Sequence, residues 1–308
     1  MKLSNFIRKN WASIALWCVV IVLAIFIAAH FFGASGNYLE VVFIDVGQGD
    51  GAFIRTSSGV RAVIDAGGDW RGGNNVGRDI VGSYLIRRGI FSLDKAFVSH
   101  FHADHGRGVA ELAEVIQFDR LFLPNVDYDN QLHRDLVAAA NRIDADIYYI
   151  SRGHIVHLDD YTYFEILWPI GGGAAYHSGI TFFRGNPVNH NDDSLVMRLV
   201  YGNTTFLFTG DIEERAEVAL LNEPRMSADI LQVAHHGSRS SSGDEILDLI
   251  SPRYAIVSAG LNNQFGHPHA SVVNSLNRVG TTIYRTDWQG TVTFSVDRNG
   301  IVSIRTTR

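Results

Sequence analysis

The stretch Lys95-Ala-Phe-Val-Ser-His-Phe-His-Ala-Asp-His-Gly106 reads as a buried strand that ends in a cluster of metal-ligating side chains. Three histidines and an aspartate fall within six positions: His100, His102, Asp104 and His105. Because side chains alternate along extended backbone, His100 and His102 point the same way, and the other two follow where the chain turns. Imidazoles with one carboxylate suit Zn or Mn better than Ca or Mg. We therefore predict a metal site here rather than a solvated polar loop.

Further candidate ligands also stand where apolar strands end. Asp65 follows an Ala-Val-Ile run, Asp211 follows Phe-Leu-Phe-Thr-Gly, and His235 follows Ile-Leu-Gln-Val-Ala. Layered folds place their clefts at such a sheet edge, so we expect these side chains to converge. A single aspartate after glycine is often only a helix cap, but the place of Asp211 between two other ligand sets favours a ligand. His236 directly follows His235, and alternation along the strand favours His235 slightly as the inward residue.

Composition limits the classes of protein that fit. The chain has 308 residues and a formal charge of −6; without Lys2, Arg8 and Lys9, which precede an apolar segment, 23 basic residues face 32 acidic ones. This balance argues against tight binding of duplex DNA through a basic face, although an enzyme can still receive nucleic acid in a small cleft. Cys18 is the only cysteine, which excludes an intrachain disulfide and a thiolate in the predicted metal site.

The N-terminal region predicts a membrane anchor. Residues 11–32 contain no formally charged side chain, and about 20 apolar residues span a bilayer. A basic tail, residues 1–10, precedes this segment, and residues 33–37 read as a short linker. The positive-inside rule then places the tail in the cytoplasm and the rest of the chain outside the membrane. A cleavable signal peptide is the competing interpretation, and a buried helix of a soluble protein is a third.

From residue 38 the pattern changes to short strands interspersed with helices. We expect, among others, strands at 194–201, 204–209 and 229–234 and helices at 132–143, 213–221, 244–250 and 270–278. Two runs of strands with intervening helices predict an α/β fold in which two sheets pack together and helices cover their outer faces.

These motifs resemble the metallo-β-lactamase superfamily. The match comprises Ser99-His-Phe-His-Ala-Asp-His-Gly106, Thr209-Gly-Asp211 and His235-His-Gly-Ser238, in the order of that family. Within it the sequence is most similar to the domain of ComEC competence proteins, which mediate bacterial DNA uptake. The motifs specific to that subgroup are Phe43-Ile-Asp-Val-Gly-Gln-Gly-Asp50, Asn191-Asp-Asp-Ser-Leu195, Gly266-His-Pro268, and Thr286-Asp287 with Gly290.

The resemblance covers roughly residues 38–305 and implies a four-layer αββα sandwich. With the transmembrane helix that residues 11–32 predict before it, the hydrolase domain would comprise residues 38–308. The resemblance also implies one or two metal ions at the sheet edges. His100 and His102 would hold the first ion, and Asp104, His105 and one of His235 and His236 would hold the second. Asp211 would bridge the two.

The sequence departs from the family pattern before the strand that leads to Asp211. Many members carry another histidine there, whereas this chain reads Asn189-His-Asn-Asp-Asp-Ser194. The first metal position would then be weaker, unless His190 replaces the missing ligand. Three residues of this run, Asn191, Asp192 and Ser194, would orient a phosphate or complete the metal site through water.

The expected chemistry is hydrolysis by metal-activated hydroxide, since a bound metal lowers the pKa of water towards about 7. Asp104 and Asp211 would orient the nucleophile, and His267 or His269 would protonate the leaving group. Gln48 and Asp50 lie in a glycine-rich turn that reads either as a phosphate-binding loop or as a plain hairpin. Ser238 follows the histidine pair and is a further candidate for binding substrate.

Three functions compete. The leading hypothesis is a membrane-anchored phosphodiesterase or nuclease that acts on DNA outside a bacterial cell. Single-stranded DNA is a candidate substrate, and a separate channel protein is a candidate partner. The second is a metallohydrolase of small phosphoesters or lactams. The excess of acidic residues favours a small substrate over a long polyanion. The third is a non-catalytic component of a DNA-uptake complex.

Overall fold

The computed structural model describes residues 10–11, 13–23, 38–126, 130–171, 190–300 and 302–308. The chain divides into two compact units, residues 1–36 and 37–308. In the first unit, residues 10–11 and 13–23 are helical. Within the described ranges no helix has both the length and the apolar character that crossing a membrane requires. Most of the predicted basic tail, the second half of the predicted span 11–32 and the linker lie outside the described residues.

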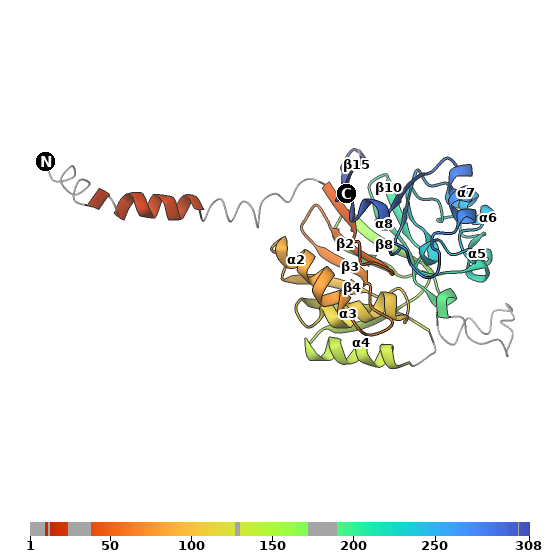
Figure 1. The fold of residues 1–308 in the computed structure, drawn as a ribbon, viewed down its shortest axis with the longest axis horizontal. Helices are drawn as coiled ribbons and strands as arrows, with labels where there is room; N and C mark the ends of the chain where they lie inside the picture. Colours follow the sequence, from red (N-terminus) through yellow and green to blue (C-terminus); the bar gives the residue numbers. More distant parts are fainter. Residues whose placement is uncertain (1–9, 12, 24–37, 127–129, 172–189, 301) are drawn as a thin grey trace. The chain divides into compact units, whose positions relative to one another are not determined.

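Two β-sheets form the centre of the second unit (Figure 1). The first sheet has the order β15 (Val302–Thr306), β14 (Val292–Asp297), β1 (Tyr38–Phe43), β2 (Gly51–Arg55), β3 (Arg61–Ala66), β4 (Ser92–Phe97), β5 (Gln117–Pro124), β6 (Asp146–Ile150). The second has the order β13 (Thr282–Arg285), β12 (Tyr254–Val257), β11 (Ile230–Gln232), β10 (Thr204–Phe208), β9 (Val196–Tyr201), β8 (Thr162–Trp168), β7 (Ile155–His157). Strands β3 to β6 run parallel to one another, as do β10 to β13.

Helices cover the outer face of each sheet, and Figure 1 shows the two groups on opposite sides of the sheets. The first group comprises the π-helical turn η1 (Gly77–Gly82), α2 (Ser83–Arg87), the turn η2 (Ala103–Arg107), α3 (Gly108–Leu112) and α4 (Gln131–Arg142). The second comprises α5 (Glu214–Leu220), α6 (Asp244–Ile250) and α7 (Ala270–Arg278). Short helices η4 (His190–Asp193), η5 (Ala234–Gly237) and α8 (Thr286–Gln289) lie in connections. The predicted αββα arrangement is therefore confirmed.

Three apolar clusters explain why the layers adhere. One lies between the two sheets and includes Phe43, Phe97, Phe164 and Phe208. The other two lie between each sheet and its own helices. Strand β1 is buried at nearly every position because both faces of its sheet are covered, and Leu39, Val41, Val42 and Phe43 reflect this, with Glu40 the one charged residue among them.

The carboxyl ends of the parallel strands bring their connecting loops to one edge of the sandwich. Backbone hydrogen bonds tie these loops together: Leu195 N–H donates to Ser99 O at 2.8 Å, and His235 N–H donates to Gly210 O at 3.0 Å. Gly49, with φ +128°, lies so close to the Asp104 carbonyl that a Cβ atom would not fit. The positions of the loops at this edge are thus fixed by backbone contacts, and the polar strand ends point into the same space.

Candidate metal centre

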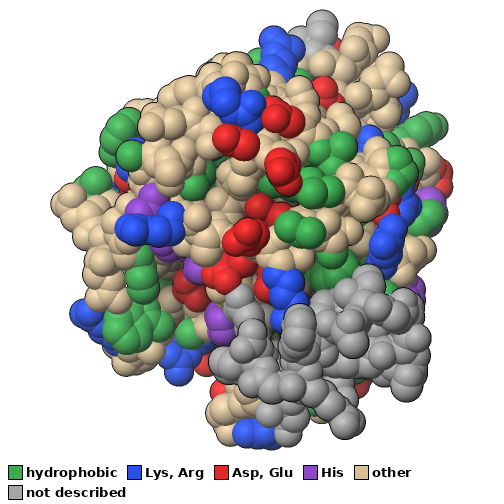
Figure 2. All heavy atoms as spheres, turned by 90° about the vertical axis from the view of Figure 1, so that its right-hand side faces the viewer, with side chains coloured by type: hydrophobic (Ala, Val, Ile, Leu, Met, Phe, Trp, Pro, Cys, Tyr) green, Lys and Arg blue, Asp and Glu red, His purple; other side chains and the backbone are tan. Residues whose placement is uncertain are grey.

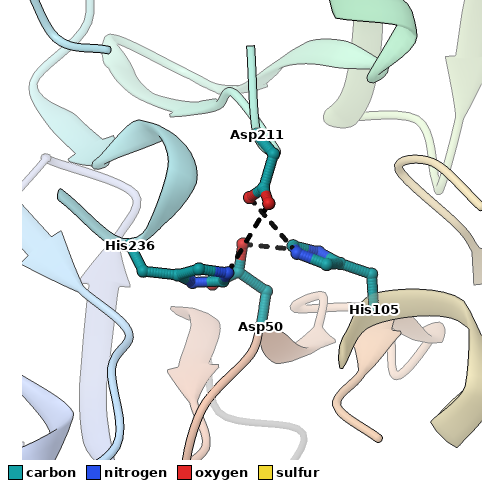
Figure 3. A group of neighbouring side chains, drawn as sticks. All are labelled: Asp50, His105, Asp211 and His236. Carbon is teal, nitrogen blue, oxygen red and sulfur yellow. Dashed lines mark ion pairs between the residues drawn. The ribbon is translucent and has the colours of Figure 1, made fainter. Parts of the chain in front are cut away.

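Four buried side chains meet at this edge: Asp50, His105, Asp211 and His236 (Figure 3). Each offers one ligand atom, and all these atoms lie within 4.8 Å of one another. Asp50 comes from the β1–β2 loop, His105 from η2 after β4, Asp211 from the turn after β10 and His236 from η5 after β11. The group, which we call the metal centre, therefore joins loops from both sheets.

Asp211 lies between the two imidazoles of the centre. Its Oδ1 is 3.2 Å from His105 Nε2, and its Oδ2 is 3.6 Å from His236 Nε2. His236 Nδ1 is in turn 3.6 Å from Asp50 Oδ1. None of the atoms Asp50 Oδ1, Asp211 Oδ1, His105 Nε2 and His236 Nε2 has a hydrogen-bond partner of normal geometry among the described residues. Buried polar atoms are rarely left in this state, and four of them facing one another fit a bound cation.

The electrostatics of the centre point the same way. Burial disfavours a charged imidazole, yet the Asp211 carboxylate outweighs it and raises the pKa of His105 well above its ordinary value. The same balance raises the pKa of His236. Burial alone would raise the pKa of Asp211, but the two neighbouring histidines hold it well below its usual range. Protons thus balance the carboxylates here, and a metal ion would take over that role with release of protons.

Further groups fix how the ligand atoms point. Asp65 Oδ2 lies 3.0 Å from His105 Nδ1, and the backbone carbonyl of Ser258 lies 2.9 Å from His236 Nδ1. In each case the oxygen accepts a hydrogen bond from the Nδ1–H of the histidine. The Nε2 atom of that ring is then left without a proton and faces the centre. Gln232 donates to Asp50 Oδ2, and the Asp211 backbone N–H donates to Ser194 Oγ at 3.1 Å. Sequence reasoning singled out Asp65 as the end of a strand but missed Gln232, which is a polar residue in the otherwise apolar strand β11.

His100 and His102 lie beside the centre, and His100 also faces Asp211. His100 Nε2 is 3.8 Å from Asp211 Oδ2, is buried, and has no hydrogen-bond partner among the described residues. The ring of His100 lies 4.7 Å from that of His102 and 4.3 Å from that of His105, measured between centroids. The half-exposed ring of His102 lies 6.1 Å from that of His190. These side chains can form a second metal position that shares Asp211.

Asp104 lies at the outer side of the centre. Its Oδ2 is 3.4 Å from His236 Nε2, and its side chain keeps 24% of its surface exposed. Burial would raise the pKa of Asp104, but the nearby imidazoles of His236 and His105 lower it. The carboxylate is therefore ionised at neutral pH and accessible to a metal ion or a substrate.

His236, rather than His235, belongs to the centre. The alternation argument assumed extended backbone, but β11 ends at Gln232, and both histidines adopt left-handed conformations, with φ of 49° for His235 and 56° for His236. The tight turn buries His236 and leaves the His235 side chain 22% exposed. His235 Nδ1 lies 3.1 Å from Glu213 Oε1, and its Nε2 is 3.8 Å from Asp211 Oδ2. Non-glycine residues in this conformation carry strain, which is common at functional sites.

The residues predicted from the Asn191–Ser194 motif are divided between two roles. Ser194 supports Asp211, as described above. Asp192 Oδ1 accepts hydrogen bonds from the backbone N–H groups of Glu213 and Ala216, so it caps α5 instead of facing the centre. Asn191 Nδ2 donates to Glu213 Oε1 at 3.2 Å, within the group that also holds His235.

The remaining predicted site residues lie in the same loops as the ligand residues or in the loop after β12. Gln48 Oε1 accepts the backbone N–H of Gly260 at 3.1 Å, and Ser238 Oγ lies 2.9 Å from Ser240 Oγ. The ring of His267 is 6.2 Å from that of His236 and 5.1 Å from that of His269. Burial and the nearby histidines lower the pKa of His267 to about 4. His267 is therefore neutral at pH 7 in this arrangement, and its role as the proton donor stays a prediction.

Comparisons with known proteins agree with this geometry. Residues 44–260 match the sequence profile of the Metallo-beta-lactamase superfamily. The chain is 30% identical to ComE operon protein 3 of Bacillus subtilis over 267 residues, which cover 83% of this chain and 33% of that protein. It is also 30% identical to Recombination protein 2 of Haemophilus influenzae over 311 aligned positions, 99% of this chain and 35% of that protein. The chain thus spans about a third of the length of these relatives.

Solved structures share the fold at low sequence identity. The metallo-beta-lactamase fold protein YhfI from Bacillus subtilis gives a TM-score of 0.50 at 12% identity, covering 87% of this chain and all of that one. The E377D mutant of CmlA beta-hydroxylase gives 0.52 at 14% identity, covering 83% and 53%. Together with the profile match over most of the compact unit, these findings identify the chain as a member of the metallo-β-lactamase superfamily with ComEC-like competence proteins among its relatives.

Proposed function

We propose that this protein is a metal-dependent phosphodiesterase that acts on DNA. The observation that carries the proposal is the convergence of two aspartates and two histidines, all buried, with unsatisfied atoms that face one another. The ComEC-like competence proteins among its relatives make DNA the substrate class that we favour. Hydrolase members of the superfamily use metal ions, so the donor set and the family agree on the kind of catalysis.

The residues fit a divalent ion such as Zn²⁺ or Mn²⁺. Asp50, His105, Asp211 and His236 would hold one ion, and His100 and His102, with Asp211 shared, would hold a second. Such an ion, when bound, supplies electrophilic stabilisation of a substrate oxygen and acidifies water. The rest of the chemistry depends on the protein's own groups.

Those groups orient and position the reactants. Asp65 and the Ser258 carbonyl hold His105 and His236 in the tautomer that directs Nε2 inward. Asp104, ionised and partly exposed, is placed to accept a proton from, or orient, an attacking water at the outer side of the centre. His267 and His269 would contact the leaving oxygen or the phosphate. The negative charge of the phosphate would raise the proton affinity of these imidazoles.

We also propose that residues 11–32 anchor the protein in a bacterial membrane, with the hydrolase unit outside the cell and a separate channel protein as its partner. The uncharged segment and the basic residues that precede it support this arrangement. Protection of the hydrolase unit from protease added to intact cells would contradict it.

The test combines metal analysis with an assay of DNA cleavage. The full chain, purified in mild detergent, is incubated with Mn²⁺ or Zn²⁺ and labelled single-stranded DNA. We expect cleavage that requires metal, is lost in Asp211→Ala and His105→Ala, and persists in His157→Ala, which removes an exposed histidine from β7. Intact fold and bound metal without cleavage by any ion would exclude the nuclease.

A metallohydrolase of small phosphoesters is the second candidate, and one observation favours it. Four carboxylates on α5 and α6 line a pocket and would repel a long polyanion: Glu214, Glu217, Asp244 and Glu245. Ser240, which also lines this pocket, donates to Glu213, and Glu213 contacts His235. Model phosphodiesters assayed beside DNA separate the two candidates. Faster turnover of a small diester than of DNA by at least tenfold would favour the second.

A further inference from the structure

Two loops beside the metal centre each carry an aromatic ring that is exposed to solvent. Trp70, in the loop after β3, is 54% exposed, and Phe265, in the loop after β12, is 47% exposed. With Arg71, which lies next to Trp70, these residues form what we call the aromatic rim. Single exposed rings are common on protein surfaces, but two of them on loops that flank a candidate site form a candidate contact surface for its ligand.

Both loops touch the elements that supply the metal ligands. The backbone of Gly68 packs against the carbonyl of Ala103, which lies between His102 and Asp104. On the other side, Phe265 stacks on the ring of His267, with a centroid distance of 5.6 Å and an interplanar angle of 26°. His267 is the neighbour of His236 described above. The rim therefore lies within one or two side chains of the centre from both directions.

The rim is joined across the two loops. Arg71 Nη2 donates to Gln264 Oε1 at 3.0 Å, so residues adjacent to Trp70 and Phe265 are in direct contact. The guanidinium of Arg71 also lies 4.8 Å from the centre of the Trp70 ring. This arrangement places a positive charge beside the Trp70 ring and next to the residue that precedes Phe265.

A single polar side chain fixes each loop. The Asp69 carboxylate accepts hydrogen bonds from the backbone N–H groups of Arg71, Gly73 and Asn74 at 2.8–3.1 Å. Asn263 accepts from the backbone N–H groups of Phe265 and His267 and donates to the carbonyls of Gly260 and His267. The exposed rings thus sit on constrained backbone, which lowers the entropy lost when a ligand binds them.

The distribution of charge around the centre favours the rim as the path of a polyanion. Acidic side chains run across the face that carries α5 to α7, with histidines at one end of this stripe (Figure 2). The loop after β3 carries the Asp69 carboxylate, but two arginines lie next to it: Arg71, and Arg107, whose Nη1 donates to the Asp69 backbone carbonyl at 2.7 Å. A chain of phosphates with one group at the centre would be repelled by the acidic face and attracted to the rim.

We propose that Trp70 and Phe265 stack unpaired bases of single-stranded DNA, while Arg71 contacts the phosphate between them. Every base has a π-face, so the platform tolerates any sequence, but it requires bases that are not already stacked in a duplex. The proposal rests on the proposed function and deepens it, because it assigns single strands as the substrate class of the same site.

The experiment measures binding without turnover. The full chain in detergent and EDTA is titrated into a labelled 12-nucleotide single strand, or into an abasic phosphodiester of equal length and charge, and anisotropy gives the two dissociation constants. We expect DNA to bind at least about tenfold more tightly than the abasic chain, and each of Trp70→Ala and Phe265→Ala to reduce that ratio about fivefold. Trp70→Tyr and Phe265→Tyr retain a ring and should preserve the ratio.

The controls are exposed aromatic residues at the opposite end of the strands. Phe91, 63% exposed, precedes β4, and Tyr161, 61% exposed with Arg298 over its ring, precedes β8. Phe91→Ala and Tyr161→Ala should bind both oligonucleotides as the wild type does. Three results would overturn the inference. The wild type could bind the abasic chain as tightly as the single strand, the two rim alanine variants could keep the wild-type ratio of dissociation constants, or duplex DNA could bind as tightly as the single strand. Cleavage of DNA by a protein with any of those results leaves the proposed function intact, whereas the expected ratios without cleavage exclude the hydrolase and retain the binding site.

Discussion

Replacing Asp65 by Asn tests whether the metal centre depends on the tautomer of His105. Asp65 is 1% exposed and accepts three hydrogen bonds: Ser99 N–H at 2.8 Å, Ser99 Oγ–H at 2.6 Å and His105 Nδ1–H at 3.0 Å. Asparagine has the same size and keeps one acceptor for the Ser99 N–H. Its amide NH₂ must then face His105 Nδ1, where it can only donate.

The expected effect follows from that reversal. A donor at Nδ1 favours the tautomer with the proton on Nε2, so His105 presents N–H to Asp211 where the centre needs a lone pair. Loss of such an orienting group typically costs 10- to 100-fold in metal affinity, which is about 1.4–2.8 kcal/mol. We therefore expect Asp65→Asn to fold but to bind Zn²⁺ about 10- to 100-fold more weakly.

Competition with a chromophoric chelator measures this affinity, and circular dichroism checks the fold. Asp94→Asn is the matched control, because Asp94 also accepts a backbone hydrogen bond, from Arg61 at 2.7 Å, but lies at the far end of β4. The control should bind Zn²⁺ as the wild type does. A folded Asp65→Asn protein with an affinity within about twofold of wild type would refute the tautomer argument.

Three other predictions concern the ligand pair, a buried charge and pH. His236→Ala should remove one bound metal ion per chain, whereas His235→Ala should retain it; equal losses by metal analysis would contradict the assignment. Glu40→Gln should lower the free energy of unfolding by about 2–3 kcal/mol, measured with urea, because it removes the buried negative charge that faces Arg88 at 2.7 Å and Arg55 at 3.4 Å. A loss below about 0.5 kcal/mol would contradict this. Burial raises the pKa of Glu217 from 4.5 to about 6, so its protonated form stabilises the fold below pH 4.5, and about 2 kcal/mol is lost as pH rises past 6. Stability curves of Glu217→Gln should lack this loss, and parallel curves for the two proteins would exclude it.

The layers and most strand ends could be predicted from the sequence because each has a local signal. A strand covered on both faces is a continuous apolar run, and a polar residue directly after it marks the edge of the sheet. This is why the sequence alone indicates that Asp211 and the His100–His105 motif lie at strand ends. The short helix α8, with only four residues, has no such pattern and was not predicted.

The composition of the centre could not be predicted because it depends on contacts between distant segments. Asp50 was assigned to substrate binding from its glycine-rich turn, and only the fold shows that Gln232, 182 positions away, turns it towards His236. The choice between His235 and His236 failed for a different reason. Alternation applies to extended backbone, and nothing in the residue types signals two consecutive non-glycine residues in the left-handed region.

Asp211 makes the two metal positions interdependent. Its Oδ2 faces both His100 and His236, at 3.8 and 3.6 Å, while Oδ1 faces His105. An ion held by the centre would replace the protons whose positive charge now compensates Asp211. It would bind the same carboxylate that a second ion near His100 and His102 would need as a ligand. Two cations close together repel, and the missing family histidine leaves that second position with fewer ligands to offset the repulsion. A phosphate bound between the positions adds negative charge where it is required, so the second ion and the substrate should each strengthen the binding of the other.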